Sequence, residues 1–258
     1  REAQSLGGVV ASGDNEMSAE LDRVNREIFE ESMEIIKEAW YNERFSFTGK
    51  HFVLPPPGIP DRGSTVQDLT LIPKPIAPID VWQAVTSPAT LEYTARVGHH
   101  AVMPARGIEK TKTWWDEFGT KANEHGWELG QGEHRCLALN AHVGRTSDEA
   151  RNGARNAHDE WIKFLSPYGR FRSYSMPDGS ETPFDHKPSL EDSIDQDVMA
   201  IGSVEEVADT MGRYRDEVGV EHFVLFFDMP GLTQGAMNEQ LELMATEVLP
   251  RIGAELNS

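Results

Sequence analysis

From residue 79 onward, short apolar segments alternate with longer amphipathic segments, and this alternation limits the folds that the chain can adopt. The apolar segments predict buried strands, whereas the amphipathic segments have the 3.6-residue spacing of helices. Strands that alternate with helices of this length form βαβ units, in which the strands are parallel and each crossover is right-handed. The sequence therefore predicts an α/β fold. The expected strands cover residues 79–85, 101–103, 136–143 and 223–227.

The boundaries of the expected helices carry residues that start or stop helices. Gly98 and Gly219 each follow an amphipathic segment, where glycine commonly ends a helix. Ser203 and Glu206 have the spacing of a capping box, which marks a helix start. The expected helices cover residues 88–97, 108–125, 146–164, 203–218 and 236–249.

Before this alternation the chain is less regular. Apolar residues at helical spacing predict a helix over residues 18–40, and residues 45–54 are expected to form a short hairpin. Residues 55–78 carry seven of the fifteen prolines and are expected to be irregular. Residues 166–197 are polar, weakly periodic and too long for an ordinary connection, so we expect a lid or an insertion there. We treat residues 1–258 as a single domain.

Composition excludes several classes of partner and site. The formal net charge of −19 argues against a nucleic-acid partner, which would require a basic face. The single cysteine, Cys136, excludes a disulfide framework and a cysteine-rich zinc site, and the nine histidines have no metal-ligand spacing. No apolar run approaches the roughly 18–20 residues of a membrane span, and no signal peptide is visible. We therefore expect no metal, no membrane contact and a cytoplasmic location.

The most specific local feature is the segment Thr86-Ser87-Pro88-Ala89-Thr90, directly after the first expected strand. Ser87 is expected to cap the next helix, with Pro88 as its first residue and Thr90 as its third. The free N–H groups at such a helix start bind phosphate readily, and the hydroxyls of Thr86, Ser87 and Thr90 would add donors. Taken alone, the pattern is more simply explained by ordinary helix capping.

Other candidate residues receive structural interpretations. Trp82 and Cys136 lie in apolar strand segments and are expected in the core. His134, His142, His158 and His222 are interpreted as isolated structural or surface residues. We find no Ser-His-Asp arrangement and no glycine-rich phosphate loop, and we assign no catalytic residue.

Several segments resemble one known family in their order and spacing. Residues 202–208, 219–225 and 247–251 resemble the C-terminal signature of the bacterial luciferase-like monooxygenases. Residues 34–52 resemble that family's helix and following extended segment, and residues 73–90 resemble its proline-rich approach and phosphate turn. Each motif is loose, but together they cover the chain from about residue 20 onward.

The resemblance implies a TIM (β/α) barrel of the luciferase-like type. Four strong strands, where such a barrel has eight, imply a partial barrel that corresponds to the C-terminal part of the family fold. The chain also begins Arg1-Glu2-Ala3 without an initiator Met, so we expect the N-terminal strands of the family to be missing.

The resemblance also implies a function. It predicts a flavin-dependent monooxygenase that takes reduced FMN from a separate flavin reductase and uses O₂ to oxygenate a small organic substrate. In the family, the residues that match Thr86, Ser87 and Thr90 hold the FMN phosphate. A homodimer is expected as well. Two alternatives remain open: a deazaflavin-dependent oxidoreductase of the same superfamily, and a non-catalytic flavin-binding homologue.

Overall fold

The computed structural model describes residues 16–227 and 230–253, and the chain divides into two compact units. The first unit ends at Ile79 and the second begins at Asp80. Each unit is described by itself below. The expectation of a single domain over residues 1–258 stays a prediction.

The smaller unit is built on one long helix, α2 (Glu16–Tyr41), as its apolar spacing predicted. The predicted hairpin is formed by β1 (Phe47–Thr48) and β2 (Val53–Leu54), which pair antiparallel. The Glu31 carboxylate on α2 accepts the backbone N–H groups of the hairpin turn, with Lys50 N at 2.7 Å and His51 N at 2.9 Å. The segment expected to be irregular contains a second small hairpin, β3 (Pro60–Asp61) and β4 (Ser64–Thr65).

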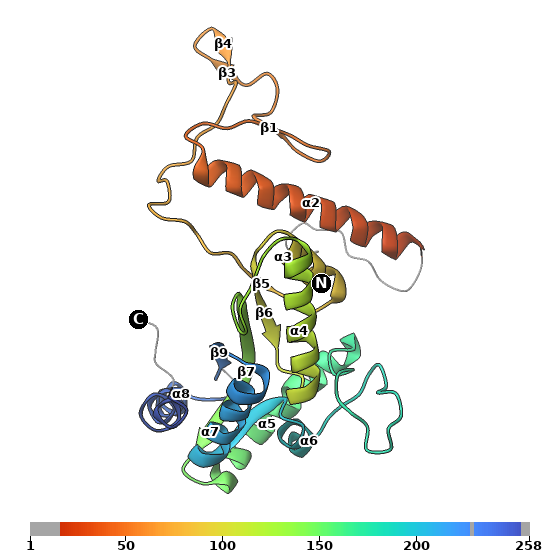
Figure 1. Cartoon of the computed structure of the whole chain (residues 1–258), viewed down its shortest axis with the longest axis vertical. Coiled ribbons are helices and arrows are strands. Elements are labelled where there is room, and N and C mark those ends of the chain that lie inside the picture. The colour runs from red at the N-terminus through yellow and green to blue at the C-terminus, as the bar shows by residue number, and fades with distance from the viewer. Residues whose placement is uncertain (1–15, 228–229, 254–258) are drawn as a thin grey trace. The chain divides into compact units, whose positions relative to one another are not determined.

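The larger unit contains a parallel sheet of five strands, which confirms the predicted α/β class (Figure 1). Its strands are β5 (Trp82–Ala84), β6 (His100–Pro104), β7 (Arg135–Gly144), β8 (Met199–Ser203) and β9 (His222–Phe226). The four predicted strands correspond to β5, β6, β7 and β9. The prediction missed β8, because its short apolar run directly follows the polar segment 166–197 and adjoins the cap of the next helix.

The helices of the larger unit follow the predicted segments closely. The predicted capping box at Ser203 and Glu206 is present, with Glu206 N 3.3 Å from Ser203 Oγ. The last helix runs past the predicted end at residue 249, because Pro250 occupies a first-turn position where no intrahelical N–H is needed. The helical elements are α3 (Pro88–Arg96), α4 (Ile108–Glu124), α5 (Ser147–Leu165), η1 (Ser166–Tyr168), α6 (Leu190–Asp195), α7 (Val204–Arg213), η2 (Tyr214–Val218), α8 (Gln234–Leu243), η3 (Met244–Val248) and α9 (Leu249–Arg251).

The central strand is β7, which pairs in parallel with β6, β8 and β9. Because successive strand residues point to opposite faces, the register divides the sheet cleanly into two faces. Met103, Leu137 and Leu139 belong to one face and pack in the main core with side chains from α3, α4, α7 and α8. The other face, which we call the open face, carries Trp82 and Phe226, which are 42% and 45% exposed.

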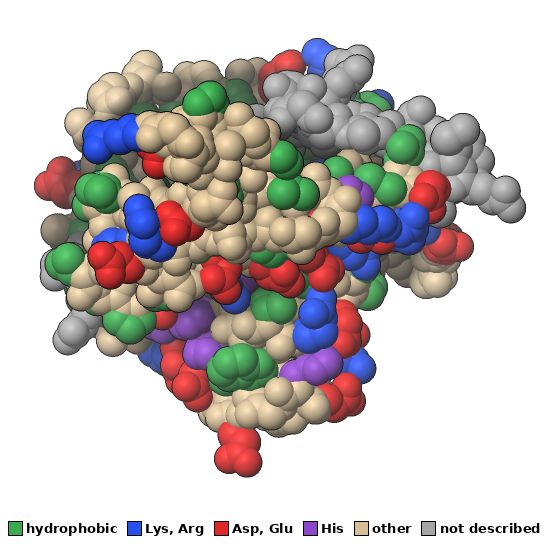
Figure 2. Space-filling view, turned by 90° about the horizontal axis from the view of Figure 1, so that it is seen from above, with side chains coloured by type: hydrophobic (Ala, Val, Ile, Leu, Met, Phe, Trp, Pro, Cys, Tyr) green, Lys and Arg blue, Asp and Glu red, His purple; other side chains and the backbone are tan. Residues whose placement is uncertain are grey.

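Strand pairing in the described part of the larger unit leaves an open sheet, since no pairing among residues 80–227 and 230–253 links β5 to another strand besides β6. The parallel sheet and its helices belong to the α/β class that the sequence predicted. Figure 2 shows Lys and Arg side chains interspersed among Asp and Glu side chains on the one face of the chain in view. No helix among the described residues is both long and apolar enough to cross a membrane.

The division into two faces makes a stability prediction. Leu139 is fully buried on the helix-covered face of β7, whereas Val224, on the neighbouring strand, is 40% exposed on the open face. We expect Leu139→Ala to lower the free energy of unfolding by about 2–5 kcal/mol, since it leaves a core cavity. Val224→Ala, the matched control, should change the free energy of unfolding of the monomer by no more than about 0.5 kcal/mol. Urea denaturation at a protein concentration where the chain is monomeric measures both, and equal losses would show that the open face is buried within the monomer.

Candidate functional site

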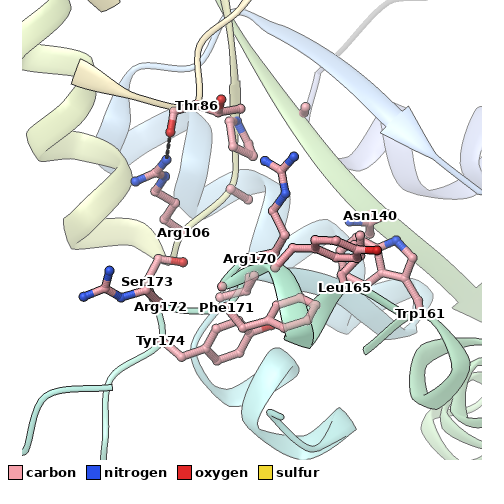
Figure 3. Close-up of a pocket in the computed structure, with 16 residues that line it drawn as sticks. Thr86, Arg106, Asn140, Trp161, Leu165, Arg170, Phe171, Arg172, Ser173 and Tyr174 are labelled. Atoms are coloured by element: carbon pink, nitrogen blue, oxygen red, sulfur yellow. Dashed lines mark hydrogen bonds between the residues drawn. The ribbon is translucent and has the colours of Figure 1, made fainter. Parts of the chain in front are cut away.

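A cavity of about 590 Å³ lies where β5, β6 and β7 approach their carboxyl ends. Thr86 follows β5, Arg106 follows β6, and Asn140 lies within β7, so three neighbouring strands contribute to the same wall. The opposite wall comes from the end of α5 and from residues 166–174 (Figure 3). In parallel β/α folds, binding and catalytic groups gather at this end of the sheet, which makes the cavity the candidate site.

The predicted phosphate turn lies at one edge of this cavity. Ser87 is the N-cap of α3, and its Oγ atom accepts the backbone N–H of Thr90 at 3.3 Å. The Ser87 and Thr90 hydroxyl oxygens are 2.9 Å apart, so the two side chains converge. Thr86 is exposed and lines the cavity, whereas Ser87 and Thr90 are half-buried. The capping geometry is therefore as predicted, and the role in phosphate binding stays a prediction.

Arg106 is a site residue that the sequence analysis did not identify. Its Nη2 atom donates to the backbone oxygen of Thr86 at 3.3 Å, and its guanidinium carbon lies 3.5 Å from the ring centroid of Trp114. Desolvation in this position lowers the pKa of Arg106 from its ordinary value. Its position in the sequence could have indicated this role. Arg106 follows the end of β6 by two residues and therefore lies at the same end of the sheet as Thr86.

The segment 166–197, predicted as a lid or insertion, supplies the other wall. It begins with η1 and ends with α6, and Phe171 and Tyr174 between them are buried. Arg170 and Arg172 both line the cavity, but Figure 3 shows Arg170 extending into it and Arg172 pointing away. Arg172 forms an ion pair with Glu181 at 3.1 Å. Movement of this segment as a lid stays a prediction.

A buried hydrogen-bond chain fastens this segment to α5. Ser193 Oγ lies 2.8 Å from the Tyr174 hydroxyl and 3.0 Å from His158 Nε2, and His158 Nδ1 lies 3.1 Å from an oxygen of Asp159. The interpretation of His158 as an isolated residue was therefore wrong. Ser193 is 0% exposed, so this Ser-His-Asp chain offers no accessible nucleophile. Burial raises the pKa of Tyr174 to about 12, which keeps its hydroxyl protonated.

Two strand residues expected in the core have different outcomes. Cys136 is buried as predicted, and burial raises the pKa of its thiol to about 11. The prediction for Trp82 was wrong, because its position in the strand places it on the open face, where it lies against His100 with ring centroids 4.4 Å apart. His134 stacks on His100 with ring centroids 3.9 Å apart.

Among the residues that the structure describes, no group of three potential ligands could hold a metal.

The buried chain generates a prediction for the cavity wall. Ser193→Ala would leave His158 Nε2 and the Tyr174 hydroxyl without their shared partner, at a cost of about 1–3 kcal/mol. We expect faster proteolytic cleavage within residues 166–197 and a lower free energy of unfolding. Ser175→Ala is the matched control, because Ser175 is exposed and, among the described residues, its hydrogen bonds are with Lys110 and Gln196. Equal cleavage rates in wild type and Ser193→Ala would mean that other contacts hold the segment.

Comparison with solved structures supports the fold. The chain is similar to the oxygenating constituent of 3,6-diketocamphane monooxygenase from the CAM plasmid of Pseudomonas putida, a type II Baeyer–Villiger monooxygenase in complex with FMN. The TM-score is 0.66 at 18% identity, over 92% of this chain and 65% of that one. For a monooxygenase from Streptomyces bottropensis the TM-score is 0.63 at 17% identity, over 94% and 67% of the two chains.

A third similar structure is an F420-dependent secondary alcohol dehydrogenase in complex with an F420-acetone adduct. Its TM-score is 0.52 at 14% identity, over 89% of this chain and 62% of that chain. The chain thus spans about two thirds of the length of these solved structures.

Sequence comparison identifies the family. No curated protein matches the chain in sequence. The family model of the luciferase-like monooxygenases, in contrast, matches residues 8–222, which is most of the chain. The chain therefore belongs to the luciferase-like monooxygenase family.

Proposed function

We propose that the protein is a flavin-dependent monooxygenase of the cytoplasm that uses reduced FMN and O₂ to oxygenate a small organic substrate. The observation that carries this proposal is the turn from Thr86 to Thr90, in which Thr86 lines the cavity and the hydroxyls of Ser87 and Thr90 converge at the start of α3. Membership of the luciferase-like monooxygenases, and an FMN complex among the similar structures, support the choice of cofactor.

The residues at the turn fit a phosphate group. Pro88 has no N–H, and the N–H of Ala89 has no carbonyl partner within α3, so it is available to an anion at the helix start. Ser87 and Thr90 would donate their hydroxyls, and Arg106 would add positive charge from the neighbouring strand end. The described residues that line the cavity include no Asp or Glu that would repel the phosphate.

The flavin would supply the redox chemistry, since reduced FMN provides the electrons that activate O₂. The protein's residues would bind and orient the reactants. Trp161, Leu165 and Phe171 form an apolar wall that would exclude water from the reacting groups. No side chain is assigned to catalysis. We also propose that a separate flavin reductase delivers the reduced cofactor.

A deazaflavin-dependent oxidoreductase is the second candidate, because an F420-dependent dehydrogenase is among the similar structures. Absorbance spectra of the protein mixed with each cofactor discriminate the two, since only the true cofactor should bind stoichiometrically. A non-catalytic flavin-binding homologue would bind FMN but show no substrate-dependent oxygen consumption with a supplied reductase.

The phosphate site makes the first prediction of this proposal. We expect the double variant Ser87→Ala, Thr90→Val to bind FMN at least about tenfold more weakly, because each hydrogen bond to a charged group contributes roughly 1.5–3 kcal/mol. Riboflavin, which lacks the phosphate, should bind both proteins equally. Fluorescence titration with each flavin measures the difference.

A control variant tests whether loss of a helical threonine hydroxyl away from the turn affects flavin binding. Thr113→Val changes a threonine on the exposed face of α4, where its hydroxyl donates to Glu109 O, and should leave both flavins unaffected. Equal weakening of FMN and riboflavin by the double variant would mean that Ser87 and Thr90 serve the fold alone. Unchanged affinity for both would place the phosphate elsewhere.

The expected homodimer makes a separate prediction. The open face exposes Trp82, Val224 and Phe226, and apolar patches of this kind commonly mark association surfaces. We expect sedimentation equilibrium to show a dimer for the wild type and a monomer for Val224→Asp, which changes a residue that lines neither cavity. The control, Phe164→Asp, places the same charge at an exposed position on α5 and should leave the dimer intact. A monomeric wild type would contradict the proposal.

A further inference from the structure

The cavity at the strand ends has a local charge opposite to that of the whole chain. The protein has 43 acidic and 24 basic side chains, yet the described residues that line the cavity include no carboxylate and include two arginines, Arg106 and Arg170, that form no ion pair with a described residue. Two such guanidinium groups would attract an anion over a short range, within about one Debye length of 8–10 Å. The lining therefore favours an anion that the rest of the surface would repel.

Arg170 differs in its surroundings from the two other arginines that line the cavity. Arg106 donates to Thr86 O, and Arg172 pairs with Glu181, whereas Arg170 forms no hydrogen bond or ion pair with any residue in the described part of the chain. Figure 3 shows its guanidinium extending into the cavity between Arg106 and Asn140. A guanidinium offers donors in a planar fork that matches a carboxylate or sulfonate in bidentate geometry.

The surroundings of Arg170 are suited to an apolar body attached to such an anion. Trp161 and Phe171 pack edge to face with ring centroids 5.5 Å apart and form the wall beside it. A second cavity of about 410 Å³ shares Asn140 and Trp161 with the first and continues past Met199 and Phe226. A ligand with its anionic group at Arg170 would therefore find apolar surface for a ring system directly adjacent.

We infer that this site binds an organic anion, a carboxylate or sulfonate carried on an aromatic or alicyclic body, with Arg170 as the anion-binding residue. The inference deepens the proposed function, since this anion would be the substrate that is oxygenated. It is independent of the phosphate turn, because Arg170 comes from the segment 166–197 and not from the start of α3.

The test is calorimetric titration of the full chain with 2-naphthoate and with its neutral isostere 2-naphthamide. We expect the wild type to bind naphthoate more tightly, and added salt to weaken naphthoate alone. Arg170→Gln should weaken naphthoate binding by about tenfold or more and change naphthamide binding by less than about twofold. Arg172→Gln is the matched control, because Arg172 lies on the same segment but points away, and it should bind both probes as the wild type does.

The same titrations contain the outcomes that would overturn the inference. Equal affinity of the wild type for the two probes, no binding of naphthoate at millimolar concentration, or unchanged naphthoate binding in Arg170→Gln would each do so. Displacement of naphthoate by FMN but not by riboflavin would assign Arg170 to the cofactor phosphate instead. The FMN proposal is tested separately, by the effect of the Ser87→Ala, Thr90→Val variant on FMN affinity. Arg170→Gln should bind FMN with the same affinity as the wild type, so failure of one proposal does not imply failure of the other.

Discussion

The pairing of β7 with three parallel strands is the constraint on which the larger unit depends. A ten-residue strand is long enough to bond β6 and β9 along its first half and β8 along its second half. Because every pairing is parallel, the carboxyl ends of the strands lie toward the same end of the sheet. Thr86 and Arg106, which follow β5 and β6, meet there for that reason, although 19 residues separate them in the sequence.

The same strand fixes which side chains are available for binding. Its alternation places Leu137 and Leu139 in the core and Ala138 and Asn140 toward the cavity. Displacing the register by one residue would exchange these two sets, so core packing and site composition are coupled. A change that disturbs the core of β7 should therefore disturb the site as well.

Electrostatics distinguishes the cavity from the rest of the surface. Elsewhere most arginines lie beside carboxylates, as in the pair of Arg213 with Asp197. Two of the three arginines around the cavity, Arg106 and Arg170, instead face a backbone oxygen, an aromatic ring or open space. This difference is the physical basis for proposing that both a phosphate and an organic anion bind at this end of the sheet.

Much of the fold could be predicted because its signals are local. Capping at Ser87 and Ser203 was predicted correctly, since a cap depends only on residues within one helical turn. The strand β8 was missed, because a five-residue strand between a polar segment and a helix cap has too few residues to show a period. The orientation of Trp82 was also wrong, because an apolar strand pattern does not say which face of the sheet is covered.

The sequence by itself determined the α/β class, four of the five strands of the sheet, the turn from Thr86 to Thr90 and the family resemblance, which is confirmed by the family match. Only the tertiary structure decided that Arg106 reaches Thr86, that Ser193 joins His158 to Tyr174, and that Arg170 enters the cavity. The first two contacts join residues that lie 19 or more positions apart in the sequence. Arg170 belongs to the segment 166–197, whose apolar residues have no regular spacing. Helix and strand signals act over a few residues, whereas contacts of this kind exist only once the parallel strands have brought their ends together.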